Sequence, residues 1–375
     1  MAEKMQGDGQ TRALLVKFGA IGDVLMVIPA AYALHQSGFA IDWICGVQVL
    51  PILQLYPWIR PIVAEDRALL KGSFGERLRA LAMLWRMLGG RRYTLCATLY
   101  YDARYRAITL PVRARRKLQL SLVDRTYRLL SGRHHTDEFA RILLGSADGV
   151  EPTQPAPVPP PVGNLPPTPL SRGDRQRIVL APGGAQNMMA NAILRRWPVE
   201  QYVALADALL AQGLEIVLIG GPDDDWVRPW FAALPVEDLI GRLSLTQTIA
   251  LLNSGDVFVT HDTGPMHLGG VASIGIVALF GPTDPRSFAP RRPGTVALWG
   301  GEGFACRPCY DGRNFAACPS NDCMRQISTE MVLQEVMAML KDRIRGYLAA
   351  PRILTPPSTT APAALVTAVG QAGQA

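Results

Sequence analysis

A turn able to bind an anion lies in the second half of the chain. An apolar run at 256–260 leads into Asp262-Thr263-Gly264, and a helical pattern begins at Pro265. The first turn of a helix leaves backbone N–H groups unpaired and carries a partial positive charge, which suits a phosphate. Gly264 allows close backbone approach, and the Thr263 hydroxyl adds a donor. Asp262 is equally well explained as the N-cap of this helix, so the turn alone leaves both interpretations open.

A second glycine-bearing turn follows the apolar segment 177–181. Gly183 and Gly184 come directly after this predicted strand, and Arg195 lies downstream in Arg195-Arg196-Trp197-Pro198. Glycines at a strand end expose backbone N–H groups, and a guanidinium can neutralise a diphosphate through two parallel hydrogen bonds. The alternative for Arg195 is a solvated surface residue.

A third turn carries acids after the predicted strand 215–219. Gly221 is followed by Pro222 and then by Asp223-Asp224-Asp225. We expect Asp223 or Asp225 to accept hydrogen bonds from a ribose diol. The triplet also matches a metal-binding pattern of some transferases. Acids at the start of a helix are more simply explained by the helix dipole, so a metal is the weaker interpretation.

The first half offers one carboxylate in a comparable position. Gly19-Ala-Ile-Gly22-Asp23 separates a short apolar strand, 13–18, from an apolar helical stretch, 24–36. A carboxylate at the mouth of a sheet can act as a general base when a substrate hydroxyl reaches it across a cleft between domains. The competing interpretation is that Asp23 caps the helix.

Four of the six cysteines lie within eighteen residues. Cys306, Cys309, Cys318 and Cys323 have the spacing C-x2-C-x8-C-x4-C. Disulfides are disfavoured in a cytosolic protein, and two close thiol pairs suggest a tetrahedral structural zinc site. Free thiols or a redox pair are the alternatives. Cys45 and Cys96 fall on predicted strands and are expected in the core.

The elements that must position these residues alternate between strands and helices. Strands are predicted at 13–18, 40–45, 61–64, 95–99, 177–181, 215–219, 256–260 and 275–280, and helices at 24–36, 73–88, 198–212, 245–253 and 265–272. This order predicts an α/β protein with doubly wound parallel sheets, in which ligands bind beyond the carboxyl ends of the strands. Proline dominates 151–170, which we expect to be an extended linker. It separates an N-terminal domain, 1–150, from a C-terminal domain, 171–350, and residues 351–375 are expected to be disordered.

Composition narrows the class of partner. The 375 residues carry a net charge of +7, and nine Lys or Arg residues lie between Arg104 and Arg133 against one acid, Asp124. Such a field favours an anionic partner, for which a membrane or glycolipid surface is a better candidate than nucleic acid, although a merely solvated face would look the same. The start of the chain has no apolar signal-like segment, and the longest apolar run, Val24–Leu34, has eleven residues. We therefore expect a cytoplasmic protein with at most a peripheral contact at the inner membrane face.

With these residues in view, the chain resembles glycosyltransferase family 9, the lipopolysaccharide heptosyltransferases, from Arg12 to about Leu348. The motifs that carry the resemblance are Val16–Asp23, the Pro-Gly-Gly and Arg-Trp-Pro segments, Asp262–His267 and the cysteine segment that closes on Cys323-Met324. Between Tyr100 and Leu170, where acceptor recognition is expected, the match is weak.

The resemblance implies the GT-B fold, in which two Rossmann-like domains face each other across a cleft, and inverting sugar transfer without a metal. It implies a nucleotide-sugar donor, most commonly ADP-heptose, and an anionic glycolipid or oligosaccharide acceptor. Asp23 matches the catalytic aspartate. The residues expected at the donor are Lys17, Gly183, Gly184, Arg195, Gly221, Asp223, Asp225, Asp262, Thr263, Gly264 and His267.

Two other functions share this architecture. One is a nucleotide-sugar 2-epimerase, which would act without an acceptor. The other is a non-catalytic protein that binds a sugar nucleotide, against which the presence of Asp23 argues.

Overall fold

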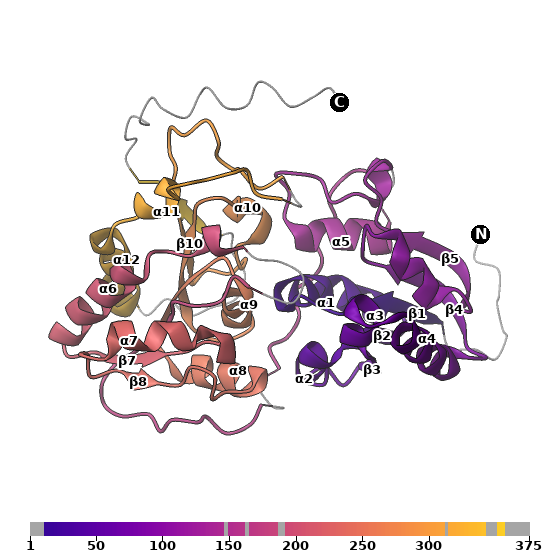
Figure 1. Ribbon diagram of the computed structural model, residues 1–375, viewed down its shortest axis with the longest axis horizontal. Coiled ribbons are helices and arrows are strands. Elements are labelled where there is room, and N and C mark those ends of the chain that lie inside the picture. The colour runs from indigo at the N-terminus through magenta and orange to yellow at the C-terminus, as the bar shows by residue number, and fades with distance from the viewer. Residues whose placement is uncertain are drawn as a thin grey trace.

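The computed structural model describes residues 11–145, 149–161, 165–186, 192–311, 314–342 and 351–356. Two parallel sheets, each flanked by helices, form the two halves of the molecule (Figure 1). The alternation of strands and helices predicted from the sequence is confirmed.

The N-terminal sheet has five parallel strands in the order β3-β2-β1-β4-β5. They are β1 (Arg12–Val16), β2 (Ala40–Gly46), β3 (Ile59–Ala64), β4 (Arg92–Thr98) and β5 (Arg113–Gln119). The central strand β1 is apolar throughout its buried part because both of its faces are covered. Leu15 joins the core on one face, and Leu14 and Val16 join the core on the other.

The helices of this half are α1 (Ile21–Gln36), α2 (Leu50–Leu53), α3 (Asp66–Lys71), α4 (Phe74–Leu88) and α5 (His135–Leu144). Its short 3-10 turns are η1 (Val47–Val49), η2 (Ala103–Thr109) and η3 (Arg125–Tyr127). Neither β5 nor α5 is predicted by the sequence pattern. The strand reads RARRKLQ and exposes most of its side chains, because it forms the charged edge of the sheet.

The C-terminal sheet has the order β12-β11-β10-β9-β6-β7-β8. Its strands are β6 (Arg177–Ala181), β7 (Glu215–Leu218), β8 (Glu237–Asp238), β9 (Val257–His261), β10 (Gly275–Phe280), β11 (Thr295–Trp299) and β12 (Arg352–Leu354). The helices are α6 (Val199–Ala211), α7 (Arg228–Phe231), α8 (Leu245–Ser254), α9 (Gly264–Gly270), α10 (Pro285–Phe288), α11 (Asp322–Arg325) and α12 (Thr329–Asp342), with 3-10 turns η5 (Ile193–Arg195) and η6 (Pro222–Val227).

The end of this sheet corrects one expectation. Strand β12 pairs in parallel with β11, so that Val296, Ala297 and Leu298 face Arg352, Ile353 and Leu354. The prediction that disorder begins at 351 is therefore wrong for this strand, whose backbone hydrogen bonds and half-buried Ile353 outweigh the neighbouring prolines. The rest of the predicted disordered tail, 357–375, lies outside the described residues.

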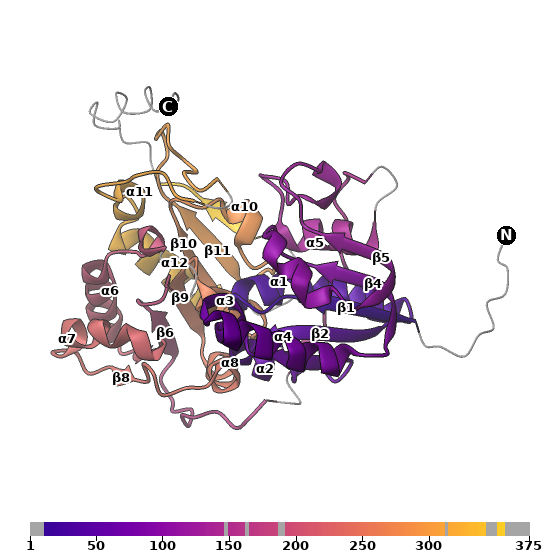
Figure 2. The ribbon, with the colours of Figure 1, turned by 45° about the vertical axis from the view of Figure 1, so that its right-hand side comes forward.

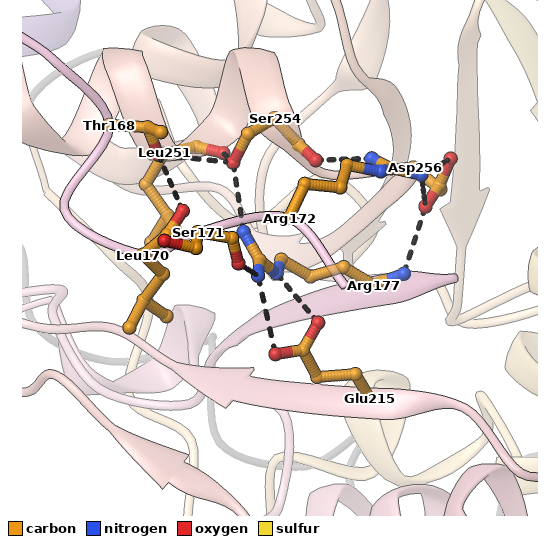
Figure 3. A network of polar contacts seen from close by, with 9 residues as sticks. All are labelled: Thr168, Leu170, Ser171, Arg172, Arg177, Glu215, Leu251, Ser254 and Asp256. Carbon is orange, nitrogen blue, oxygen red and sulfur yellow. Dashed lines mark hydrogen bonds and ion pairs between the residues drawn. The ribbon is translucent and has the colours of Figure 1, made fainter. Parts of the chain in front are cut away.

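The segment between the domains contains no helix or strand in its described parts, 149–161 and 165–176. Its later described part, 165–176, runs along the lower edge of the C-terminal half in Figure 1. Its end is tied to the C-terminal sheet by a polar network (Figure 3). Arg172 Nη2 contacts both Asp256 carboxylate oxygens at 2.9 and 2.7 Å. The buried Arg177 side chain donates to Glu215 at 2.9 Å, to the Ser254 hydroxyl at 3.0 Å and to the Ser171 carbonyl at 2.7 Å.

The strand order of the two sheets determines where the candidate residues lie. In each sheet the strand order reverses beside the first strand, between β1 and β4 and between β6 and β9. Loops at the carboxyl ends of such strands form the binding crevice of a doubly wound sheet. The turn that contains Asp23 follows β1, and the turns that contain Gly183 and Asp262 follow β6 and β9. The structure thus places the candidate residues of both domains at the carboxyl edges of their sheets.

Candidate active site

Lys17 and Asp23 form the N-terminal wall of the site. Lys17 Nζ lies 2.8 Å from Asp23 Oδ2, and the Lys17 side chain is 6% exposed while that of Asp23 is 40% exposed. Lys17 Nζ also donates to the Leu99 carbonyl at 3.2 Å and lies 4.3 Å from the centre of the Tyr100 ring. The ammonium group is therefore buried under the turn, and the carboxylate faces the space between the domains.

Tyr100 holds the turn that carries this pair. Its hydroxyl accepts hydrogen bonds from the Phe18 and Gly19 N–H groups at 2.8 and 3.3 Å and donates to the Gly19 carbonyl at 2.9 Å. One side chain thus satisfies three backbone groups that neither β1 nor α1 can pair. Burial raises the pKa of Tyr100, and the nearby Asp23 charge raises it further, so the hydroxyl stays protonated and able to donate.

Asp23 is ionised at neutral pH. Burial alone would raise the pKa of its carboxyl, but the charge and hydrogen bond of Lys17, helped by His135 and His267, hold the pKa below its ordinary value. The residue does not cap α1, because the N-cap position is occupied by Ala20 and has no side-chain hydrogen bond. The capping interpretation of Asp23 is therefore wrong, and the carboxylate is available to a ligand.

Arg195 and Asp262 form the opposite wall. Arg195 Nη1 lies 3.5 Å from Asp262 Oδ2 and donates to the Asp262 carbonyl at 3.4 Å. Within the part of the chain that the structure describes, Arg195 Nε and Asp262 Oδ2 are buried without a hydrogen-bond partner. The guanidinium also lies 5.6 and 5.3 Å from the centres of the Tyr310 and Phe315 rings. Buried groups of this kind are normally satisfied, so both residues keep bonding capacity for a ligand.

The turn after β9 also differs from a simple cap. Thr263, not Asp262, occupies the N-cap position of α9, and no side chain caps this helix. The Thr263 hydroxyl donates to the His261 carbonyl at 3.2 Å. Because α9 has only seven residues, its dipole is short, and Arg195 is the stronger source of positive charge beside Asp262.

Asp224 organises the glycine-bearing turns after β6 and β7. Its buried carboxylate accepts from the Gly184 N–H at 2.6 Å and from the Gly221 N–H at 2.8 Å. A Cβ on Gly183 would lie 2.3 Å from Asp224 Cγ, so this position needs glycine. The Gly184 N–H, which was expected to face a phosphate, is therefore engaged by a carboxylate, and the same carboxylate holds the two turns together.

The acids on either side of Asp224 are exposed. Asp225 pairs with Arg228, three residues on. Asp223 is the exposed acid nearest to Gly221 in sequence. The helix-start interpretation of the triplet is confirmed for Asp224, which lies in the first turn of η6 and accepts from the Gly221 N–H.

The two walls meet where α1 and α9 begin. A Cβ on Gly22 would lie 2.4 Å from the His267 ring, and one on Gly264 would lie 3.4 Å from Ile21. Burial lowers the pKa of His267, against the opposing effect of the Asp262 and Asp23 charges. His267 is therefore a neutral imidazole that lies close enough to both carboxylates to respond to their charge.

His135, at the start of α5, is a site residue that the sequence did not indicate. Burial lowers its pKa to about 4, opposed by the Asp23 charge and reinforced by Lys17. Its Nδ1 is buried without a hydrogen-bond partner among the described residues, and its ring lies 4.5 Å from that of Phe288 in the other domain. Tyr100 and Asp224 were also missed. The only sequence signal for Asp224 was its place inside an acidic triplet, and His135 had none, because α5 was not predicted.

The contact between the starts of α1 and α9 is called the seam below. A cavity of about 430 Å³, lined partly by α1, adjoins it. Met26 and Pro29 of α1, Pro155–Pro161 of the linker segment, His267 and Arg291 contribute to its lining. Arg291 pairs with Asp137 at 2.8 Å, and His134 Nε2 lies 3.0 Å from the Ala289 carbonyl, so polar contacts also join the domains here.

The four clustered cysteines are free thiols. Cys309 and Cys323 are half-buried, and Asn321 N–H donates to Cys318 Sγ at 3.2 Å. In the described residues no three His, Cys, Asp or Glu side chains are placed to share a metal ion, either here or at the acidic triplet.

The described helices include none long and apolar enough to cross a bilayer.

Known proteins resemble both halves of this arrangement. Residues 154–316 match the model of glycosyltransferase family 9 (heptosyltransferase). Lipopolysaccharide heptosyltransferase 3 of Escherichia coli is 28% identical over 131 residues, which is 33% of this chain and 38% of that relative. Lipopolysaccharide heptosyltransferase 1 of Pseudomonas aeruginosa is 24% identical over 322 residues, 80% of this chain and 86% of the relative.

A solved structure shares the whole fold. An E. coli heptosyltransferase determined with ADP superimposes with a TM-score of 0.65 at 18% identity, covering 88% of this chain and all of that one. At this identity the likeness establishes the fold, and the predicted GT-B architecture is confirmed.

Gly22→Ala tests the seam. We expect this change to destabilise the protein by about 1–3 kcal/mol, because the new methyl group overlaps the His267 ring. Gly75→Ala is the matched control, since Gly75 also lies in the first turn of a helix but has open space around its Cβ position. Thermal unfolding of both variants measures the difference, and equal midpoints would show that α1 and α9 do not make this contact.

Proposed function

Because the chain belongs to glycosyltransferase family 9, we propose that it transfers a sugar, heptose from ADP-heptose, to a lipopolysaccharide-type acceptor. In this proposal the transfer inverts the anomeric centre and needs no metal ion. The observation that carries it is the pair of the half-buried Arg195 and the buried Asp262, whose Arg195 Nε and Asp262 Oδ2 atoms have no hydrogen-bond partner among the described residues and which lies across the seam from the ionised Asp23.

Asp23 is the proposed general base. The acceptor hydroxyl gives its proton to a carboxylate oxygen of Asp23 as the hydroxyl oxygen attacks the anomeric carbon. The bond from that carbon to the phosphate oxygen breaks on the opposite face, and the electron pair leaves with the nucleotide diphosphate. A lowered pKa keeps Asp23 ready to accept the proton at neutral pH.

In this proposal Arg195 stabilises the departing charge, and Lys17 holds Asp23 in place. Arg195 has a buried N–H group to offer, and Lys17 places a buried ammonium group beside Asp23. Fixed cations that face the leaving group favour the transition state over the bound substrate. The Arg195 guanidinium can supply charge that a divalent metal supplies elsewhere, and this is the reason for proposing a metal-independent reaction.

The remaining donor contacts are assigned by position. We propose that Asp262 contacts the donor sugar, that Thr263, Gly264 and Gly183 lie along the diphosphate, and that Asp223 approaches the ribose. Gly184 and Gly221 act through Asp224, which already holds their N–H groups. The acceptor is an anionic glycolipid or oligosaccharide reached at the inner face of the cytoplasmic membrane, to which the basic N-terminal domain is attracted.

One assay separates this function from its alternatives. ADP-heptose is incubated with the protein, with and without lipopolysaccharide core acceptor, and ADP is measured. A transferase releases ADP at an appreciable rate only when the acceptor is present. A 2-epimerase converts a nucleotide sugar without an acceptor, and a binding protein does neither. Thermal-shift screening of ADP-, UDP- and GDP-sugars identifies the donor, because a ligand of the folded state raises the unfolding midpoint.

Asp23→Asn isolates the proposed base. We expect the transfer rate to fall by about 10²–10⁴-fold, because an amide cannot accept the proton. Donor affinity measured by calorimetry should stay within a fewfold, since the donor is held mainly by the C-terminal domain. Transfer at the wild-type rate would exclude Asp23 as the base.

Arg195→Ala tests the phosphate contact. We expect nucleotide-diphosphate affinity to fall by about tenfold to a hundredfold, because a hydrogen bond to a charged group contributes about 1.5–3 kcal/mol. Arg115→Ala, an exposed arginine on the edge strand β5, is the control for loss of one positive charge. Calorimetry that finds equal affinities for the two variants would contradict the assignment.

We also propose that Cys306, Cys309, Cys318 and Cys323 hold a structural zinc ion that takes no part in catalysis. Burial raises the pKa of Cys323 to about 12, and the neighbouring Cys309, Cys318 and Cys306 add to this effect. Thiolates placed close together repel one another, and a cation bound among them would relieve this repulsion. The thiols must close on the ion when it binds.

Elemental analysis of the purified protein decides the cysteine question. We expect equimolar zinc, lost in Cys306→Ser and retained in Cys96→Ala, where the thiol is buried on β4. A protein without metal, or with iron in place of zinc, would refute the zinc assignment, since four thiolates suit either ion.

A further inference from the structure

The polar contacts of Arg195 are too long to fix its guanidinium group by themselves. Arg195 Nη1 lies 3.5 Å from Asp262 Oδ2 and 3.4 Å from the Asp262 carbonyl oxygen, and Arg195 Nε has no hydrogen-bond partner among the described residues. A hydrogen bond between an arginine and a carboxylate is usually about 2.7–2.9 Å long. Contacts other than those to Asp262 must therefore help to hold the guanidinium group in place.

Two aromatic rings supply such contacts. Arg195 Cζ lies over the Phe315 ring at 5.3 Å from its centre and over the Tyr310 ring at 5.6 Å. The centres of the two rings are 4.7 Å apart. A cation within about 6 Å of a ring centre is attracted by the negative face of the ring. Tyr310 and Phe315 are called the ring pair below.

The ring pair is fixed to the carboxyl edge of the C-terminal sheet. Tyr310 and Phe315 form an antiparallel bridge, and the Ala316 N–H donates to the Cys309 carbonyl at 3.2 Å. The Tyr310 N–H donates to the carbonyl of Pro282, which lies in the turn after β10, at 3.1 Å. Backbone hydrogen bonds therefore set the position of the rings beside Arg195.

The ring pair also reaches the other domain, through Phe288. The Tyr310 ring lies 6.3 Å from that of Phe288 in α10, and the Phe288 ring lies 4.5 Å from that of His135 in α5. Figure 2 shows α10 at the side of the C-terminal half that faces the N-terminal half. A row of rings thus runs from Arg195 to the N-terminal wall of the site.

We propose that the ring pair positions Arg195 for the diphosphate of the donor. A ring that contacts the face of a guanidinium group leaves the N–H groups in its plane free to donate. A second carboxylate in the same place would occupy those N–H groups and offset the positive charge that attracts a phosphate. Tyr310 and Phe315 are positioning residues that act through Arg195, and this role rests on the donor site proposed above.

Packing of the cysteine-bearing segment is the competing role for the two rings. In that case leucine, which is also large and apolar, would serve nearly as well as an aromatic residue. Positioning requires a ring, because only a ring offers the cation a negative face. The two roles therefore differ in how ligand affinity responds when a ring is replaced by leucine.

Calorimetry with the full-length protein and ADP as the ligand tests the proposal. We expect Tyr310→Leu and Phe315→Leu each to weaken ADP binding by about threefold to thirtyfold, the range that loss of one cation–ring contact implies. Tyr310→Phe, which keeps the ring, should bind ADP as tightly as the unchanged protein does. Phe304→Leu is the matched control, since Phe304 is a half-buried ring of the same segment that lies outside the ring pair.

A double variant separates positioning from packing. In the Arg195→Ala background, Tyr310→Leu should cause no further loss of ADP affinity, because the ring acts only through the guanidinium group. Losses that add, or leucine variants that bind ADP as tightly as the unchanged protein, would overturn the proposal. Unfolding midpoints are measured for every variant, and if one leucine variant does not fold, the other carries the same test.

The result for Arg195→Ala alone shows which proposal fails. If this change leaves ADP affinity unaltered, the diphosphate contact of Arg195 is wrong and the positioning role is overturned with it. If Arg195→Ala weakens ADP binding and neither leucine variant does, only the role of the ring pair is overturned.

Discussion

The contact between Gly22 and the His267 ring determines how the two halves of this protein can act together. Each half is a parallel sheet whose candidate turns gather at one edge, with the Lys17–Asp23 pair on one edge and the Arg195–Asp262 pair on the other. Where α1 begins against α9, only a glycine leaves room for the imidazole. This close approach lets the Asp23 and Asp262 charges act on the same ring. Any change that moved the helices apart would separate the two walls.

The charged groups around this seam differ in how far their hydrogen-bonding capacity is used. Lys17 is fully engaged by Asp23, Leu99 and the Tyr100 ring, whereas Arg195 and Asp262 meet at 3.5 Å and keep atoms without hydrogen bonds. Burying such atoms costs free energy that an ordinary core avoids. A ligand with phosphate and hydroxyl groups would recover that cost, which is the physical basis for the proposed donor site. The neutral His267 and His135 add polar groups there without adding charge.

In the glycine-bearing turns after β6 and β7, hydrogen bonds offset a loss of conformational entropy. Loops rich in glycine lose much conformational freedom when they order, and Asp224 offsets this by holding the turns after β6 and β7 with two hydrogen bonds. The turns are therefore formed before any ligand arrives. Pre-organisation of this kind reduces the entropy that binding must otherwise supply.

Much of this protein is determined by its sequence alone. Short apolar runs predicted eight strands, because a parallel strand covered on both faces must be apolar throughout. The glycine, proline, aspartate and threonine residues after four of them predicted the edge at which ligands bind. The same pattern singled out Asp23, Arg195 and Asp262 as candidates. It could not predict β5 or α5, since an exposed edge strand is charged and has no apolar signature, nor β12, which lies among prolines. Only the tertiary structure decided that Asp23 and Asp262 are not helix caps, that Asp224 binds backbone rather than ligand, and that His135 joins the site. Those outcomes depend on contacts between residues far apart in the chain, such as His135 and Phe288, and no local pattern records which distant side chain will fill a given space.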